Sequence, residues 1–159
     1  MEYNELDCLY SNIILDHYHN PRNHQPLENP DLTSHAVNPF CGDEVSLQII
    51  LKSDQFTQVA VQAVGCSINK AAASMLSELI SGKNVEEIEV FSKLFRLMMN
   101  GVTLSSIQLK QLKDLQNLSK VRKFKVRIKC TLLPWLALED ATNDYHNGSH
   151  DINNPLLTN

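Results

Sequence analysis

Two stretches of the chain alternate apolar and polar residues, which is the pattern of a strand with one buried face. The apolar positions are Val45, Leu47, Ile49 and Leu51 in the first stretch, and Val59, Val61 and Ala63 in the second. Residues 52–54, Lys-Ser-Asp, favour a turn between them. We therefore expect an antiparallel hairpin, and a further short edge strand over residues 32–37.

Elsewhere, apolar residues recur every three or four positions, which predicts amphipathic helices. The expected helices cover residues 5–19, 67–81, 84–100, 107–118 and 131–144. In the last of these, Pro134 is tolerable only because it falls in the first turn. Residues 22–31 are polar and rich in proline nearby, so they are expected to form an exposed loop.

The length of 159 residues indicates one domain, which we place at residues 1–145. Residues 146–159 are rich in asparagine and are expected to form a disordered tail. No apolar run is long enough to span a bilayer, and the first seven residues are acidic and polar, unlike a secretory signal. We expect a cytoplasmic protein without a membrane partner.

A formal net charge of −4 argues against sequence-independent binding to nucleic acid. One local exception is the basic run, residues 120–129, which holds six cations and no acid. It can be a solvated face, as most charge runs are. Alternatively, it neutralises an anionic metal-thiolate site or docks an acidic partner.

The four cysteines are too scattered for the disulfide framework of a small secreted protein. Cys41 and Asp43 flank a glycine, so both side chains can turn toward one point in a tight loop. Cys66 and Cys130 each lie where a strand or loop runs into an expected helix. Cys8 lies on the first expected helix and is interpreted as a small apolar residue outside the site.

In the expected hairpin, the start of the first strand lies beside the end of the second, so Cys41 and Cys66 should be close. Three thiolates and one carboxylate suit tetrahedral zinc, and the alternative is a set of isolated buried cysteines. A zinc complex with this donor set is anionic, and Arg127 or Lys129 would stabilise it. The six histidines are interpreted as surface or helix-end residues.

Such a site permits two kinds of work. A closed site only staples the fold, whereas a carboxylate ligand can be exchanged to expose a reactive position. Cys41, on a loop, is the thiol best placed to swing out, and a thiolate is the form that attacks a persulfide sulfur.

At this point the motifs resemble a known family. The matching segments, spread over residues 6–139, are Asp16-His17-Tyr18, Asn20-Pro21-Arg22-Asn23, Asn38-Pro39 with Cys41-Gly42-Asp43, Gly65-Cys66-Ser67-Ile68, and Arg127-Ile128-Lys129-Cys130 with Trp135. Together they resemble the SufU branch of the IscU-like family, zinc-containing proteins of iron–sulfur cluster assembly.

The resemblance implies an α+β fold, with a small, mostly antiparallel three-stranded sheet, helices packed on one side, and a metal site at an exposed end. It implies that Cys41, Asp43, Cys66 and Cys130 bind zinc. It also implies that a SufS-type cysteine desulfurase delivers persulfide sulfur, which is passed on to a downstream iron–sulfur scaffold. In the family, a histidine of the desulfurase displaces the equivalent of Cys41 from zinc. The matching Arg127 would then stabilise the freed thiolate or persulfide.

Within this family, Lys129 stands where the scaffold branch has a histidine, and the chaperone motif Leu-Pro-Pro-Val-Lys of that branch is absent. The segment over residues 101–119 instead resembles the insertion of the SufU branch. The chain departs from the family pattern at Ala63, Lys70, Thr131, Leu132 and Pro134.

Three functions are therefore compatible with these residues. The first is a zinc-dependent sulfur acceptor and carrier, with Cys41 as the nucleophile and Arg127 assisting, and whether this makes it an enzyme stays open. The second is a scaffold that assembles an iron–sulfur cluster on the same residues. The third is a zinc-stapled interaction module with inert thiols, which would unfold when the metal is chelated.

Overall fold

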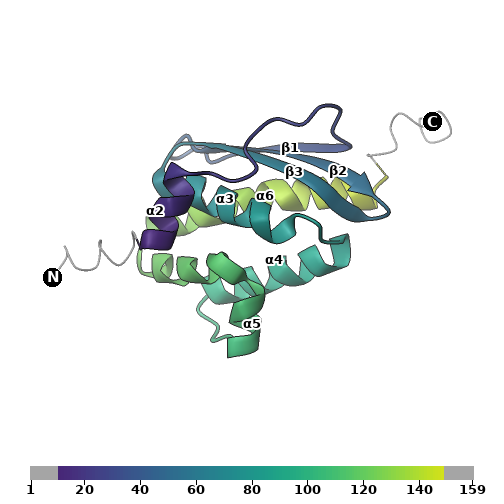
Figure 1. The fold of residues 1–159 in the computed structure, drawn as a ribbon. Coiled ribbons are helices and arrows are strands. Elements are labelled where there is room, and N and C mark those ends of the chain that lie inside the picture. Colours follow the sequence, from purple (N-terminus) through teal and green to yellow (C-terminus); the bar gives the residue numbers. More distant parts are fainter. Residues whose placement is uncertain (1–10, 149–159) are drawn as a thin grey trace.

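The computed structural model describes residues 11–148 and shows an α+β fold (Figure 1). Its sheet has three antiparallel strands in the order β1-β2-β3. The strands are β1 (Leu32–Val37), β2 (Glu44–Lys52) and β3 (Gln55–Val64). The expected hairpin and edge strand are both confirmed.

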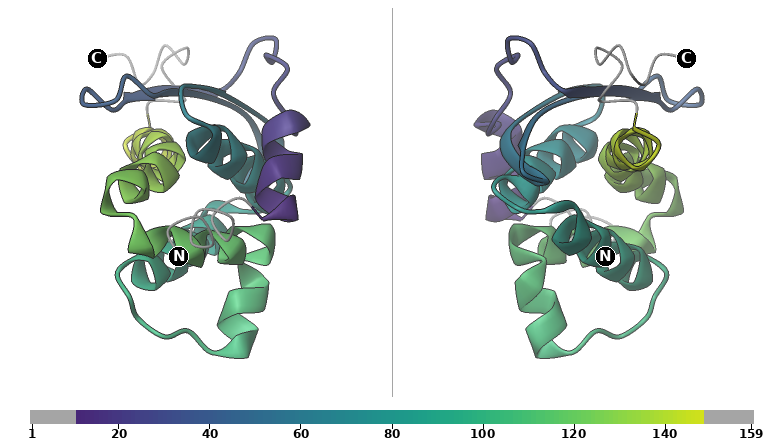
Figure 2. Two further views of the ribbon diagram at one scale, coloured as in Figure 1. Left: turned by 90° about the vertical axis from the view of Figure 1, so that its left-hand side faces the viewer. Right: turned by 90° about the vertical axis from the view of Figure 1, so that its right-hand side faces the viewer.

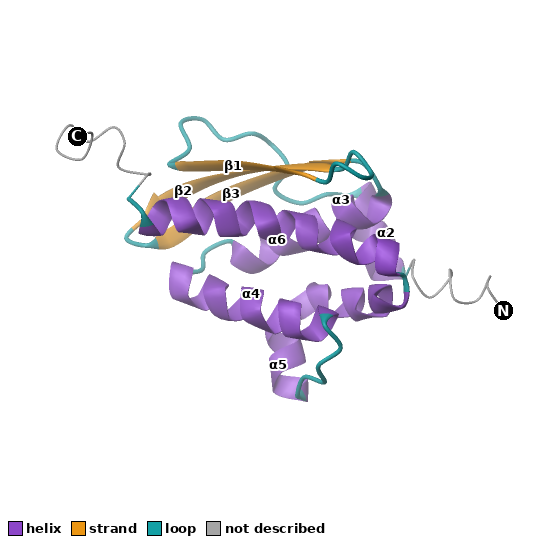
Figure 3. Ribbon diagram, turned by 180° about the vertical axis from the view of Figure 1, so that it is seen from behind, coloured by secondary structure: helices purple, strands orange, loops and turns teal. Residues whose placement is uncertain are grey.

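The helices of the described part of the chain lie on one side of this sheet, in two layers (Figures 2 and 3). They are α2 (Asn12–His19), α3 (Ser67–Ile80), α4 (Val85–Met99), α5 (Ser106–Gln111), the 3₁₀ helix η1 (Lys113–Lys123) and α6 (Lys125–His146). Helices α3 and α6 lie directly under the sheet, and α2 lies beside α3. Helices α4, α5 and η1 form the layer beyond them. The expectation of helices on one side is confirmed.

The core lies between the sheet and the first helical layer. Val45, Leu47 and Ile49 alternate along β2 and are all buried, as the period of two requires. The second helical layer is joined to the first by Phe95 of α4, whose ring stacks on the buried ring of Trp135 at a centroid distance of 5.0 Å. Among the helices of residues 11–148, none combines the length and hydrophobicity needed to cross a membrane.

Two expectations at the chain ends concern residues beyond this range. The first expected helix is seen from Asn12, with the Ser11 side chain accepting a hydrogen bond from Ile14 N–H, while Cys8 lies outside the described residues. At the other end, α6 continues to His146, and most of the expected tail, residues 149–159, also lies outside them.

The expected helix over residues 107–118 is in fact two pieces. Helix α5 ends at Gln111, and η1 begins at Lys113, whose φ of 51° breaks the helical path between them. The leucines of the expected apolar face are nevertheless buried where η1 meets the core, as Leu115 and Leu118 show.

The last helix begins at Lys125, not near Thr131, so the expected start is wrong. Pro134 therefore lies well inside α6 and not in its first turn. A proline there lacks the N–H that would bond to the carbonyl of Cys130, at a cost of about 3 kcal/mol. The helix forms in spite of this because it packs against α3, β1 and β2 along its length.

Replacement of Pro134 by alanine is expected to stabilise the protein. Alanine restores the backbone N–H that bonds to the Cys130 carbonyl, which stabilises the folded state. The unfolded chain also becomes more flexible without the proline, and this offsets part of the effect. The free energy of unfolding should rise by about 1–2 kcal/mol. Urea denaturation would measure this. The exposed position Asp140 on the same helix provides the control, and Asp140→Ala should stay within about 0.5 kcal/mol of the original protein. Equal stability of all three proteins would contradict the prediction.

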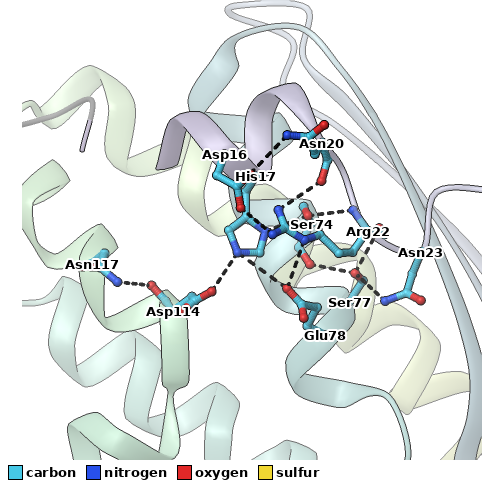
Figure 4. A network of polar contacts seen from close by, with 10 residues as sticks. All are labelled: Asp16, His17, Asn20, Arg22, Asn23, Ser74, Ser77, Glu78, Asp114 and Asn117. Atoms are coloured by element: carbon cyan, nitrogen blue, oxygen red, sulfur yellow. Dashed lines mark hydrogen bonds and ion pairs between the residues drawn. The ribbon is translucent and has the colours of Figure 1, made fainter. Parts of the chain in front are cut away.

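His17 lies in the last turn of α2, as the helix-end interpretation requires, but it is fully buried and not on the surface. Its Nδ1 lies 2.8 Å from Ser74 Oγ, which also accepts the Arg22 N–H at 2.9 Å (Figure 4). Its Nε2 lies 2.9 Å from Asp114 Oδ2 and 3.6 Å from Glu78 Oε1. The ring thus joins α2, α3 and η1, and a proton on Nε2 lets it donate a hydrogen bond to Asp114.

We expect His17→Ala to lower the free energy of unfolding by about 2–4 kcal/mol, because it leaves a cavity and removes the partners of Ser74 and Asp114. His35 is exposed on β1, and His35→Ala should change stability by less than about 0.5 kcal/mol. Thermal and urea unfolding of both variants would check this. A His17 variant as stable as the His35 variant would show that the network contributes nothing.

Candidate metal centre

The first candidate ligand lies in a tight loop, residues 38–43, at the end of the sheet where β2 begins. The loop is closed by hydrogen bonds from Asn38 N–H to the Asp43 carbonyl and from Gly42 N–H to the Asn38 carbonyl, both 2.8 Å. Gly42 adopts a φ of 72°, which glycine reaches without strain. Cys41 is exposed at the tip of this loop, and Asp43 at its base is buried.

The Asp43 carboxylate receives hydrogen bonds from the start of α3. Its Oδ1 accepts the Cys66 N–H at 3.0 Å, and its Oδ2 accepts the Cys66 thiol at 3.3 Å. The register explains this meeting, because Glu44 pairs with Val64 and so places the loop beside the end of β3. The Cys41 loop and the start of α3 are thus neighbours, while the expected closeness of the Cys41 and Cys66 thiols stays a prediction.

Gly65 makes the approach possible. A Cβ at this position would lie 1.9 Å from Asp43 Oδ1, and its φ is 124°, a value that side chains rarely allow. The sequence motif contained this glycine, but only the structure shows that the carboxylate fills the space a side chain would need.

Cys66 lies at the start of α3, as expected, and its side chain caps this helix. Its Sγ accepts the Asn69 N–H at 3.4 Å. Cys130, by contrast, lies within α6 and not at its start, and it is buried. The longer helix still brings Cys130 to the site, because the sulfurs of Cys41 and Cys130 and an oxygen of Asp43 all lie within 4.8 Å of one another.

Burial raises the pKa of the Asp43 carboxyl, but hydrogen bonds from Cys66 N–H and from the thiols of Cys66, Cys130 and Cys41 outweigh it, so the pKa lies below its usual value. Burial, followed by contacts with Cys66 and Asp43, raises the pKa of the Cys130 thiol far above its usual value. The Asp43 carboxylate thus accepts hydrogen bonds from three thiols. A divalent cation at this point would replace the thiol protons, so the donor set fits zinc.

Arg127 lies one turn before Cys130, on the same side of α6, and is half-buried. Its role and metal binding by the four ligands stay predictions. Two of the positions that depart from the family pattern make their contacts elsewhere. Ala63 pairs with Val45 in the sheet, and the Lys70 ammonium lies 5.7 Å from the Tyr18 ring centroid.

Sequence reasoning missed Asn69. Its side chain is fully buried, and its Nδ2 donates to the carbonyls of Glu44 at 3.4 Å and Val64 at 3.2 Å. It thereby ties the start of β2 and the end of β3 to the first turn of α3. A polar residue next to the buried apolar positions of a helix was the available signal.

Comparison with known proteins agrees with this arrangement. The family model of the NifU-like N-terminal domain matches residues 9–151. The chain is 42% identical over 135 residues to the "Zinc-dependent sulfurtransferase SufU" of Bacillus subtilis (strain 168), covering 84% of this chain and 89% of that protein. It is 32% identical over 150 residues to an "Iron-sulfur cluster assembly scaffold protein IscU" of Streptococcus pyogenes serotype M1, covering 94% and 92%.

Solved structures agree as well. A crystal structure of a putative iron–sulfur cluster assembly scaffold protein for the SUF system, from Fervidobacterium islandicum AW-1, superposes with a TM-score of 0.77 at 32% identity, covering 84% of this chain and 96% of that one. A NifU-like N-terminal domain from Brucella abortus has a TM-score of 0.80 at 21% identity, which shows the shared fold. The chain resembles proteins named SufU and IscU, and it belongs to the NifU-like N-terminal domain family.

Proposed function

We propose that this protein accepts persulfide sulfur at Cys41 from a SufS-type cysteine desulfurase and passes it to a downstream iron–sulfur scaffold. The observation that carries the proposal is the unequal exposure of the three thiols: Cys41 is exposed at a loop tip, Cys66 is half-buried and Cys130 is buried. Of these three cysteines, Cys41 is the one that a partner's persulfide reaches most directly. The name of the Bacillus subtilis relative supports the same chemistry.

In the transfer step, the Cys41 thiolate attacks the outer sulfur of the partner's persulfide. A new S–S bond forms on Cys41, the partner's S–S bond breaks, and its cysteine leaves as a thiolate. Zn²⁺ held by Cys41, Asp43, Cys66 and Cys130 would supply the Lewis acidity that keeps the thiols deprotonated. Arg127 would stabilise the anionic sulfur by its charge.

A cluster-assembling scaffold is the second candidate, because relatives from Streptococcus pyogenes and Fervidobacterium islandicum carry that description. The same four residues would then hold an iron–sulfur cluster in place of zinc. Anaerobic reconstitution separates the two functions, since only a scaffold yields a transferable cluster with visible absorption. A zinc-stapled interaction module with inert thiols predicts neither cluster formation nor sulfur uptake.

The test is the rate of alanine release from cysteine by a SufS-type desulfurase under reducing conditions, with and without this protein. We expect a large, saturable stimulation, because an acceptor thiol removes the persulfide that blocks the next turnover. A sample confirmed to contain zinc that gave no stimulation would contradict the proposal. The control is the same titration with protein whose thiols have been alkylated.

A further inference from the structure

An apolar groove of about 280 Å³ lies beside the Cys41 loop. One wall comes from the loop and the end of β1, and the other comes from α6. The residues that matter here are Val37, Pro39 and Phe40 on the first wall, and Lys129, Leu132 and Leu136 on the second. The groove is therefore a neighbour of the candidate metal centre, but it shares none of its four ligands.

The groove walls carry several exposed apolar side chains. Phe40 is 86% exposed, Val37 47% and Leu136 43%. Large aromatic and aliphatic side chains gathered around a recess are typical of the centre of a protein–protein interface. A pocket of this size accommodates one large side chain of a partner.

The cations at the rim of the groove indicate which charge a partner would present beside that side chain. The Lys129 ammonium lies 4.8 Å from the centroid of the Phe40 ring and makes no ion pair with any residue in 11–148. The other cation at the rim, Arg96, is already bonded to Glu139, with an Nε to Oε1 distance of 2.7 Å. Lys129 is thus the cation left to pair with a carboxylate, and it belongs to the basic run, residues 120–129.

Two residues that line the groove are next to candidate ligands in the sequence. Phe40 precedes Cys41, and Lys129 precedes Cys130, so a group seated between Phe40 and Lys129 touches the neighbours of two candidate ligands. Such a group is held at the opening of the site, where a sulfur donor has to be. An acceptor thiol gains most from a partner that is oriented in this way before the transfer.

We infer that this groove docks the sulfur-donating protein through a segment that presents one large apolar side chain beside a carboxylate. The apolar side chain lies between Phe40 and Leu136, and the carboxylate pairs with Lys129. This inference rests on the proposed function and adds to it the chemistry of the donor's docking segment.

The experiment is a titration of desulfurase stimulation with Leu136→Glu and Val37→Glu, one on each wall of the groove and both outside the candidate metal centre. We expect each to raise the half-saturating concentration by about tenfold or more, with the maximal rate unchanged, because docking and not transfer is weakened. Ile107→Glu is the matched control: it places the same charge at a 70% exposed apolar position on α5, and should shift half-saturation less than about twofold. Zinc content and thermal unfolding should match in all four proteins.

Direct binding to the desulfurase, measured by calorimetry, keeps the inference separate from the proposed function. Binding that weakens in the groove variants supports the inference even if no stimulation occurs, in which case the proposed function fails alone. Unchanged half-saturation and binding in both variants would overturn the inference. So would a loss of self-association in the variants without weaker desulfurase binding, which would assign the groove to a second copy of this chain.

Discussion

Replacement of Cys41 by alanine is expected to abolish sulfur acceptance, by at least about a hundredfold, while the protein stays folded. The thiol is exposed at a loop tip, and the loop is closed by backbone hydrogen bonds that involve Asn38, Gly42 and Asp43. Its loss therefore removes the nucleophile but little packing, so the free energy of unfolding should change by less than about 1 kcal/mol in the metal-free protein.

The measurement is protein-bound persulfide after incubation with desulfurase and cysteine, read by intact-protein mass spectrometry as the addition of sulfur. Cys8→Ala is the matched control, because Cys8 is the one cysteine of the four that neither the motifs nor the proposed site includes. It should accept sulfur normally. Persulfide formed on the Cys41 variant at the original rate would assign the chemistry to another thiol.

The second large effect is expected on the metal centre itself. In Gly65→Ala, the new Cβ would lie 1.9 Å from Asp43 Oδ1, so the buried carboxylate has to leave its position. Asp43 then loses the hydrogen bonds from Cys66, and the backbone is strained at a φ of 124°. We expect about 3 kcal/mol or more of destabilisation and a clear loss of bound zinc.

Gly82→Ala provides the control for the backbone effect. Gly82 has a φ of 78° and nothing within 4 Å of the position where a Cβ would stand, so its substitution costs only the conformational strain, about 1 kcal/mol. Urea unfolding and zinc stoichiometry after dialysis would be measured for both variants. Similar losses in the two would mean that the contact between Gly65 and Asp43 does not hold the site together.

The hairpin and the site that depends on it could be predicted from the sequence. The alternation of Val45, Leu47 and Ile49 sets the buried face of β2, and the short turn after β2 makes its partner antiparallel. Those two facts bring the Cys41 loop beside Cys66, since the start of one strand must face the end of the other. Local patterns suffice here because each contact follows from a neighbouring one.

The course of α6 could not be predicted in the same way. The rule that proline belongs in the first turn of a helix placed the start near Thr131, whereas the helix begins at Lys125. Burial of the helix against the sheet and α3 outweighs the local cost of Pro134, and a local rule cannot include that energy. The position of Cys130 within a helix was missed for this reason.

His17 shows a related limit. It stands on the apolar face of its expected helix, yet histidine is usually exposed or half-exposed, so the type of residue suggested the surface. Its burial depends on Ser74 and Asp114, which are far away in the sequence and supply the hydrogen bonds that make burial affordable. Ser74 and Asp114 lie on α3 and η1, so these contacts become visible only in the tertiary structure.

By itself, the sequence determined the strands, most helices and the family, and it supplied the candidate donor residues, because periodic burial and short motifs are local properties of a chain. The tertiary structure alone decided how far α6 extends, that Gly65 leaves room for the Asp43 carboxylate, and that Phe40 and Lys129 border one groove. These depend on distances between segments remote in sequence, which are set by packing of the whole core and not by any one pattern.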